Sequence, residues 1–420
     1  MNSVPDVLLP DVVLVQPPNI RLSDPTTRWP LGLAYLEAVL LKAGVKVAIV
    51  DLRDKKIDLA LIPEAPIVGM PATTGEILAA REIASLVKGR NSETVTVIGG
   101  AHATYLTEDC GDFDIVVVGE AEQAIVDLVK NSNRRWTVYP APVTDLDMIP
   151  FPTRHLFSFS ETLFQGAGYG RGPMATSIIT SRGCPFTCAF CQEKPRPMRF
   201  RSPENVAEEM KEIRDNWGCS HFRLEDDSFT LKPERVFDIC HLLEPLKVHW
   251  KCHTRSDLFD RDMARDMRLA GCDEVGFGVE SADRRVLKIV NKKEKIEEHI
   301  KAIRITEDSG MKAKAFLMTG LPGETDEIVD LTRDFLEKAQ PSKVILSRFT
   351  PYPGCHIWAN PEKYGVVWID PEFDHFWNFP EATTIAYRDT LPSVLDQRYK
   401  KLHQLLWNDK WRKKAPIGSY

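Results

Sequence analysis

Residues 181–191 read Ser-Arg-Gly-Cys-Pro-Phe-Thr-Cys-Ala-Phe-Cys, and this stretch says most about the fold and the chemistry of the chain. It places Cys184, Cys188 and Cys191 within eight residues, with three residues between the first pair and two between the second. Three thiolates cannot complete a tetrahedral zinc site without a further ligand. They can hold three irons of a 4Fe–4S cluster and leave the fourth iron open to a substrate.

Two other interpretations of these cysteines are weaker. A zinc site needs another Cys or His nearby, and the next ones are Cys219 and His221. A disulfide framework is disfavoured because nine cysteines are an odd number, and because residues 1–7 lack the charged start of a signal peptide. We therefore expect an iron–sulfur cluster.

The bulk composition limits the classes of protein to which the chain can belong. Its 420 residues are enough for two domains and a tail, and its 43% hydrophobic and 27% charged residues are typical of globular proteins. It has no apolar run of about 18 residues, so we expect no membrane span. The net charge of -6 argues against a nucleic-acid partner. Free thiols and an oxygen-sensitive cluster predict a cytoplasmic protein.

The region from residue 173 onward alternates between strand and helix patterns. Six such units predict a partial (β/α)6 TIM-type barrel, in which reactive residues gather at the carboxyl ends of the strands. The expected strands are 176–180, 221–224, 249–253, 274–279, 314–319 and 343–347. Polar or glycine-rich segments follow four of them, namely 225–227, 254–255, 280–281 and 320–324.

The first third of the chain predicts a doubly wound (flavodoxin/Rossmann-like) α/β domain. Short apolar runs alternate with helical patterns, which indicates a parallel sheet covered on both faces. The expected strands are 12–16, 45–51, 66–70, 95–100 and 115–120, and the expected helices are 31–42, 74–88 and 122–130, with Thr74 as a possible cap of the second helix. Ligands of such sheets bind beyond the carboxyl ends of the strands.

The cysteine spacing, with the aromatic Phe190 before the last cysteine, resembles the signature of the radical S-adenosylmethionine (radical SAM) superfamily. In that family the open iron binds S-adenosylmethionine (SAM), and one electron cleaves it to a 5'-deoxyadenosyl radical. The resemblance implies a 4Fe–4S cluster on the three cysteines and an electron donor of the flavodoxin or ferredoxin type. The SAM contacts that it implies are Phe190, Asp226, Asp227, Arg255, Gly276, Gly278, Glu280, Met318, Gly320 and Pro322.

The first domain resembles the cobalamin-binding domain that precedes many radical SAM enzymes. The matching segments are Val-Gln-Pro-Pro at 15–18, Ile-Gly-Gly-Ala-His at 98–102 and Val-Val-Gly-Glu-Ala-Glu at 117–122. Many cobalamin domains carry a cobalt-ligating His after the first strand, but here residues 17–21 read Pro-Pro-Asn-Ile-Arg. A bare scaffold of the same fold is the alternative. The implied cobalamin contacts are Pro18, Thr73, Thr74, Gly99, Gly100, His102, Gly119 and Glu120.

These patterns predict four parts. They are a cobalamin-binding-like domain (1–145), a linker (146–172), a radical SAM barrel (173–350) and an aromatic-rich, partly helical C-terminal region (351–420). The aromatic residues of the last part either cover the barrel mouth, shape a substrate pocket or form a small core. Cys355, which follows a Pro-Tyr-Pro-Gly turn, is a candidate hydrogen donor or cobalt-side ligand, with a buried structural thiol as the alternative.

The two resemblances extend from Val12 to Cys355 and imply a cobalamin-dependent radical SAM methyltransferase. Such an enzyme would methylate an unactivated carbon of a small molecule or natural-product intermediate. The alternative is a cobalamin-independent radical dehydration, rearrangement or cyclisation, with the first domain as a scaffold. An RNA methylthiotransferase is disfavoured, because that family has extra cluster cysteines in its first domain, where this chain has Cys110 alone. A non-enzymatic function, as a binding module or an electron carrier, is also disfavoured, because it does not explain the polar residues at the carboxyl ends of the barrel strands.

Overall fold

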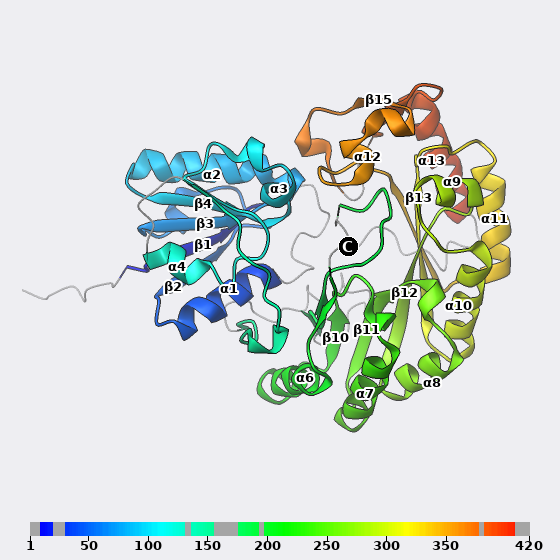
Figure 1. Ribbon diagram of the computed structural model, residues 1–420, viewed down its shortest axis with the longest axis horizontal. Coiled ribbons are helices and arrows are strands. Elements are labelled where there is room, and N and C mark those ends of the chain that lie inside the picture. Colours follow the sequence, from blue (N-terminus) through cyan, green and yellow to red (C-terminus); the bar gives the residue numbers. More distant parts are fainter. Residues whose placement is uncertain are drawn as a thin grey trace, which may run out of the picture. The chain divides into compact units, whose positions relative to one another are not determined.

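The computed structural model of the chain describes residues 9–19, 30–130, 136–154, 175–192, 197–377 and 382–407. The chain folds into two compact units, Met1–Ser158 and Phe159–Tyr420 (Figure 1). The boundary between them lies within the range expected for the linker. Most of that linker, from residue 155 on, lies outside the described residues.

The first unit is built on a six-stranded parallel sheet of order β2-β1-β3-β4-β5-β6. Helices α2 and α3 lie on one side of this sheet and α1 and α4 on the other (Figure 1). Both faces are therefore covered, which explains why strand residues such as Val13 and Val15 are fully buried. The strands are β1 (Val12–Gln16), β2 (Val47–Asp51), β3 (Ile67–Pro71), β4 (Val95–Gly99), β5 (Ile115–Val117) and β6 (Trp136–Val138). The helices are α1 (Leu31–Lys42), α2 (Ile77–Arg90), α3 (Gly100–Tyr105) and α4 (Ile125–Lys130).

Three details of this unit differ from the sequence-based expectation. Strand β6 and helix α3 were not predicted, and α3 begins at Gly100, which we expected to end a strand. Thr74 does not cap the second helix. Thr73 instead forms a capping box with Glu76 at a short 3-10 turn that precedes α2.

The second unit contains another six-stranded parallel sheet, of order β14-β13-β12-β11-β10-β7. Each strand follows its neighbour through a helical crossover, as in a partial (β/α)6 barrel. The predicted α/β fold class, with a doubly wound domain followed by a partial barrel, is thereby confirmed. The strands are β7 (Ala175–Ile178), β10 (His221–Leu224), β11 (His249–Thr254), β12 (Cys272–Glu280), β13 (Lys312–Thr319) and β14 (Lys343–Arg348).

Helices cover one face of this second sheet and form its main hydrophobic core. Alternate strand residues such as Phe222, Trp250 and Phe277 are fully buried in that core, so the intervening residues lie on the opposite face. The covering helices are α6 (Pro203–Trp217), α7 (Pro233–Leu243), α8 (Arg261–Leu269), α10 (Ile296–Asp308) and α11 (Ile328–Ala339) (Figure 1).

The sixth helix of the barrel comes from the C-terminal region. Helix α13 (Pro392–Trp407) packs on α11 and on strands β13 and β14, and Leu406 joins the main core. The expected division at residue 350 therefore separates β14 from the helix that packs on it. The end of the predicted C-terminal region, residues 408–420, lies outside the described residues.

A smaller core connects the C-terminal region with the cysteine loop. The antiparallel strands β15 (Val366–Ile369) and β16 (Ile385–Tyr387) and the short helix α12 (His356–Ala359) contribute to it, together with Ala189 from the loop. None of the helices in the described ranges is long and apolar enough to cross a membrane.

Candidate active site

The three cysteines of the motif lie in the loop between β8 (Ser181–Arg182) and β9 (Arg199–Phe200). Cys184 and Cys188 are partly buried and Cys191 is exposed, and none of the three forms a disulfide. In the part of the chain that the structure describes, no three Cys, His, Asp or Glu side chains converge as they would around a single metal ion. An iron–sulfur cluster takes one thiolate on each of several irons, so a set of thiols alone fits a cluster better than a single ion.

Hydrogen bonds from the segment after α9 (Arg284–Ile289) hold one side of this loop. The backbone N–H of Ala189 donates to the carbonyl of Val290 at 2.8 Å. The side-chain amide of Asn291 donates to the carbonyl oxygen and to Oγ1 of Thr187, at 3.0 and 2.6 Å. Asn291 has a φ of +55°, a left-handed conformation that Asn tolerates better than most residues. The loop is therefore fixed at Thr187 and Ala189, the residues on either side of its second cysteine.

The C-terminal region holds the other side of the loop. The backbone N–H of Ile357 donates to the carbonyl of Ala189 at 3.1 Å. The side chain of Gln192 donates to the carbonyl of Pro353 at 2.9 Å. Phe190, the aromatic residue of the motif, packs partly buried against the core of this region.

Arg255 reaches the loop from the carboxyl end of β11. Its guanidinium lies 3.7 Å from the ring centroid of Phe186, which stands between the first two cysteines. It also forms ion pairs with Asp257 at 2.8 Å and with Glu294 at 3.3 Å. Burial would lower the pKa of Arg255, but Asp257 and Glu294 raise it, so the buried side chain keeps its charge.

Glu280 ends β12 in an unusual backbone conformation. Its φ is +66°, and the pairing of β12 with β13 shifts register between Gly278 and Glu280. Glu280 lies 3.9 Å from the ammonium of Lys292, and burial raises the pKa of its carboxyl. A Cβ on Gly278 would lie 2.4 Å from Oε1 of Glu280 and 3.1 Å from Nζ of Lys292. Gly278 thus provides the space in which these two charged groups meet.

Gly276 lies two residues earlier on the same face of β12, and its surroundings differ. A Cβ there would lie 2.5 Å from His253 and 2.8 Å from Phe316, whose rings meet edge to face at 5.3 Å. In this structure, therefore, Gly276 makes room for two protein rings. Its predicted contact with SAM remains a prediction.

The carboxylates after β10 have different surroundings. Asp226 is 2% exposed and accepts hydrogen bonds from the backbone N–H of Thr180 at 2.7 Å, from the Thr180 hydroxyl and from the Ser181 hydroxyl at 2.7 Å. Asp227 is exposed. Asp226 thus joins the ends of β7 and β10, and Asp227 is the member of the pair that a ligand can reach. Glu225 turns to the opposite face, where it accepts from Ser177 at 2.7 Å.

The segment after β13 is held by buried hydrogen bonds. Gly320, with a φ of +89°, donates its N–H to Glu324 at 3.1 Å and accepts from the hydroxyl of Tyr387 at 2.7 Å. Burial raises the pKa of Glu324 to about 7. Met318 is half-buried against the smaller core and Pro322 is buried. Buried hydrogen bonds therefore hold the segment that carries the predicted SAM contacts Met318, Gly320 and Pro322.

Cys355 lies at the start of α12. Its sulfur accepts the backbone N–H of Trp358 at 3.3 Å, and its side chain is fully buried in the smaller core. Burial raises the pKa of the thiol to about 11. This geometry favours the structural thiol over a hydrogen donor.

In the first unit, the carboxyl ends of β1 and β3 are joined by one buried carboxylate. Glu76 accepts from the side chain of Asn19 at 3.3 Å and from the backbone N–H of Thr73 at 2.9 Å. Burial raises the pKa of Glu76. Pro18 and Thr74 are adjacent to these residues in the chain. The sheet order changes direction here, because β1 lies between β2 and β3, and ligands of open α/β sheets bind at such points.

Gly100 brings the end of β4 close to that of β3. Its φ is +88°, and a Cβ would lie 2.9 Å from the backbone N and O of Ala72. Gly99 has ordinary extended geometry. Gly119, with a φ of +97°, has open space where a Cβ would be, and half-buried Glu120 follows it. His102 is fully buried, with Nε2 2.9 Å from Asp109, so its ring does not line an open strand end.

Sequence reasoning missed three residues that contact the predicted site: Phe186, Lys292 and Glu294. The search for polar residues at strand ends could not find Lys292 and Glu294, because they lie in the connection between two helices. Phe186 lies inside the motif, but its contact with Arg255 depends on the folded loop.

Two family models match the chain. Residues 178–336 match the radical SAM superfamily, and residues 25–129 match the B12 binding domain. An uncharacterized methyltransferase of Pyrococcus horikoshii is 31% identical, over 83% of this chain and 82% of the relative. An anaerobic magnesium-protoporphyrin IX monomethyl ester cyclase of Rubrivivax gelatinosus is 28% identical, over 77% of this chain and 65% of the relative.

The fold also matches a solved structure. The radical SAM methyltransferase TsrM of Kitasatospora setae, with cobalamin and a [4Fe–4S] cluster bound, superimposes with a TM-score of 0.67 at 18% identity, covering 93% of this chain and 85% of that one. The two domain matches and the Pyrococcus horikoshii relative show that the chain belongs to the radical SAM superfamily and carries a B12-binding domain ahead of its barrel.

Proposed function

We propose that the chain is a cobalamin-dependent radical SAM enzyme that methylates an unactivated carbon of a small molecule or natural-product intermediate. One observation carries the proposal: the three-cysteine loop, Arg255 from β11 and Glu280 from β12 gather at the carboxyl edge of a barrel that follows a B12-binding domain. Reactive groups of such barrels gather at this edge.

Each group near the loop has a role that its chemistry suits. Cys184, Cys188 and Cys191 would hold the cluster, since they lie in one loop and form no disulfide. Arg255 would pair with the carboxylate of SAM or hydrogen-bond its ribose, and Glu280 would accept from ribose hydroxyls. When bound, the cluster, SAM and cobalamin supply the radical and the methyl group, and the protein contributes positioning and exclusion of water.

The first unit fits a flat cofactor at its strand ends. Gly100 allows the backbone after β4 to lie against that of Ala72, and Gly119 leaves open space beside β5. Both features keep side chains away from the edge at which ligands of this fold bind. The buried position of His102 removes it from the proposed contacts. The contacts that remain in the proposal are Pro18, Thr73, Thr74, Gly99, Gly100, Gly119 and Glu120.

The alternative, a radical dehydration, rearrangement or cyclisation without cobalamin, has less support. Residues 25–129 match a B12-binding family model, and the methyltransferase relative is matched over more of its length than the cyclase relative. We further propose a cytoplasmic location and electron delivery by a flavodoxin or ferredoxin.

The test uses anaerobically reconstituted protein with SAM, cobalamin and a low-potential reductant. The proposal predicts that both 5'-deoxyadenosine and methylcobalamin form. A variant in which all three loop cysteines are alanine is the control, and it should lose its iron and its 5'-deoxyadenosine. Neither product in wild-type protein that holds its full cluster and cobalamin would overturn the proposal.

A further inference from the structure

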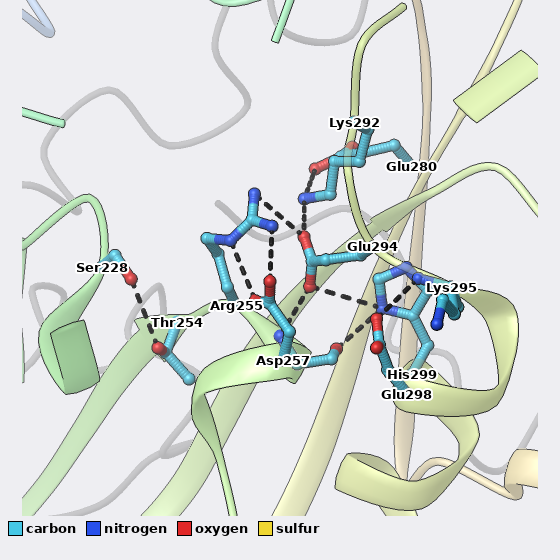
Figure 2. Close-up of polar contacts among 11 residues, drawn as sticks. Ser228, Thr254, Arg255, Asp257, Glu280, Lys292, Glu294, Lys295, Glu298 and His299 are labelled. Carbon is cyan, nitrogen blue, oxygen red and sulfur yellow. Dashed lines mark hydrogen bonds and ion pairs between the residues drawn. The ribbon is translucent and has the colours of Figure 1, made fainter. Parts of the chain in front are cut away.

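A buried glutamate connects groups that the proposed function assigns to the cofactor. Glu294 lies between α9 and α10, and its side chain is fully buried. Its Oε2 lies 2.9 Å from the ammonium of Lys292 and 3.3 Å from the guanidinium of Arg255. Its Oε1 accepts the backbone N–H of Ser256 at 2.7 Å. Figure 2 shows the carboxylate of Glu294 between the two cationic groups.

His299 supports this arrangement without adding charge. Its Nδ1 lies 2.7 Å from the hydroxyl of Ser256. The same atom lies 3.8 Å from Oε1 of Glu294 (Figure 2). Burial lowers the pKa of His299 to about 3, so the ring is neutral at physiological pH. The charges that balance Arg255 and Lys292 therefore come from carboxylates, and among the described residues Glu294 is the carboxylate that pairs with both cations.

Both cations lie beside the cysteine loop. Arg255 stacks on Phe186, inside the motif. Lys292 directly follows Asn291, whose side chain is bonded to Thr187, between the same two cysteines. A group that holds the two cations in place therefore also sets the positive charge next to the proposed cluster.

We propose that Glu294 is a positioning residue of the SAM site, which orients Arg255 and Lys292 before the cofactor binds. This inference rests on the proposed function. A buried ion cluster is weak evidence for stability, because desolvation offsets most of its attraction, so a role in orientation explains it better. The long lysine side chain has many rotamers, and a fixed partner selects one of them.

The test compares Glu294→Gln with Glu297→Gln in anaerobically reconstituted holoprotein. Glutamine keeps the size of the side chain and removes its charge. Glu297 is a matched control on the first turn of α10, because it is exposed and pairs at the surface with Arg284. The readouts are iron content, the dissociation constant for SAM, the change that SAM causes in the electron paramagnetic resonance (EPR) spectrum of the reduced cluster, and the cluster midpoint potential.

We expect Glu294→Gln to retain its iron and to bind SAM about 10- to 100-fold more weakly, the range typical of outer-shell partners. The SAM-dependent EPR change should shrink, and the midpoint potential should rise, because a negative charge has left the surroundings of the cluster. Glu297→Gln should match the wild type. If Glu294→Gln loses its cluster, Glu294→Asp, which keeps the charge, should restore both cluster and SAM binding.

The inference would be overturned if Glu294→Gln had the SAM affinity and the midpoint potential of the wild type. It would also be overturned if Glu294→Gln lost its cluster and Glu294→Asp did not restore it. These outcomes are distinct from failure of the proposed function, in which the wild type itself would neither bind nor cleave SAM.

Discussion

Glu274 on β12 carries the negative charge of a buried ion cluster on the face of the second sheet that the helices leave uncovered. Its carboxylate lies 2.6 Å from the ammonium of Lys314 and 2.5 Å from that of Lys343, and its side chain is 4% exposed. Lys251 on β11 is close enough to contribute electrostatically. The substitution Glu274→Gln would leave these buried cations without their shared carboxylate.

The size of the effect follows from the pKa of Glu274. Burial would raise it, but Lys314, Lys251 and Lys343 lower it from 4.5 to about 2. At about 1.4 kcal/mol per pKa unit, the difference corresponds to about 3 kcal/mol of folding free energy. Removal of one partner from a buried ion pair has a similar effect, about 3–5 kcal/mol.

The effect should depend on pH with a defined sign. A carboxyl whose pKa is lower in the folded state stabilises the fold fully above its unfolded pKa, and this contribution is lost as the pH falls toward the folded value. The free-energy difference between wild type and Glu274→Gln should therefore be about 3 kcal/mol at neutral pH and narrow between about pH 5 and pH 2.

Urea unfolding of the cofactor-free protein at several pH values, followed by circular dichroism and tryptophan fluorescence, measures this difference. Trp250 is buried in the same sheet and reports on it. Asp262→Asn, which removes an exposed ion pair with Arg265, is the control and should leave the transition unchanged. The reasoning would be refuted if Glu274→Gln lowered the free energy of unfolding by less than about 1 kcal/mol at neutral pH. It would also be refuted if the difference in this free energy between wild type and variant did not narrow in acid.

Three further predictions concern the loops. Gly100→Ala, which must adopt a positive φ against a neighbouring backbone, should destabilise the first unit by about 1–3 kcal/mol and reduce the cobalt retained per chain. The control Gly89→Ala in α2, where no atom lies within 4 Å of an added Cβ, should retain cobalt, and equal retention by the two variants would contradict this prediction. Asn291→Ala removes both hydrogen bonds to Thr187, so the iron content after reconstitution should fall. A full cluster in this variant would show that the cysteine loop does not need these two hydrogen bonds. Cys355→Ala removes a helix cap, which costs about 1 kcal/mol, so the melting temperature should fall by a few degrees. The formation of 5'-deoxyadenosine should not change. If a folded variant no longer forms this product, a catalytic role of the thiol would be favoured.

Much of the fold could be predicted because apolar residues mark its strands. They form a continuous buried run in 12–16 and alternate with polar residues in 221–224, and both strands have the predicted bounds. Strand β6 was missed because Trp136–Val138 is short and only half-buried. Helix α3 was missed because a glycine pair is typical of a strand end, whereas the positive φ of Gly100 here starts a helix.

The residues of the candidate site were predicted where they directly follow a strand. They were missed where only tertiary contacts bring them to the site. The sequence indicated Arg255 and Glu280 by their positions after β11 and β12. It could not distinguish Asp226 from Asp227, because the hydroxyl groups that bind Asp226 come from Thr180 and Ser181, more than forty residues earlier in the chain. Glu294 could not be found at all, since its importance arises from the fold, which brings Arg255 and Ser256 to it from a segment almost forty residues earlier.

The central claim is that one chain holds both an iron–sulfur cluster and a cobalamin. Its most direct test is the metal content after anaerobic reconstitution with iron, sulfide and hydroxocobalamin, followed by gel filtration. The account predicts about four irons and about one cobalt per chain. An intact cluster with no retained cobalt would contradict methyl transfer and make a cobalamin-independent radical reaction the better model.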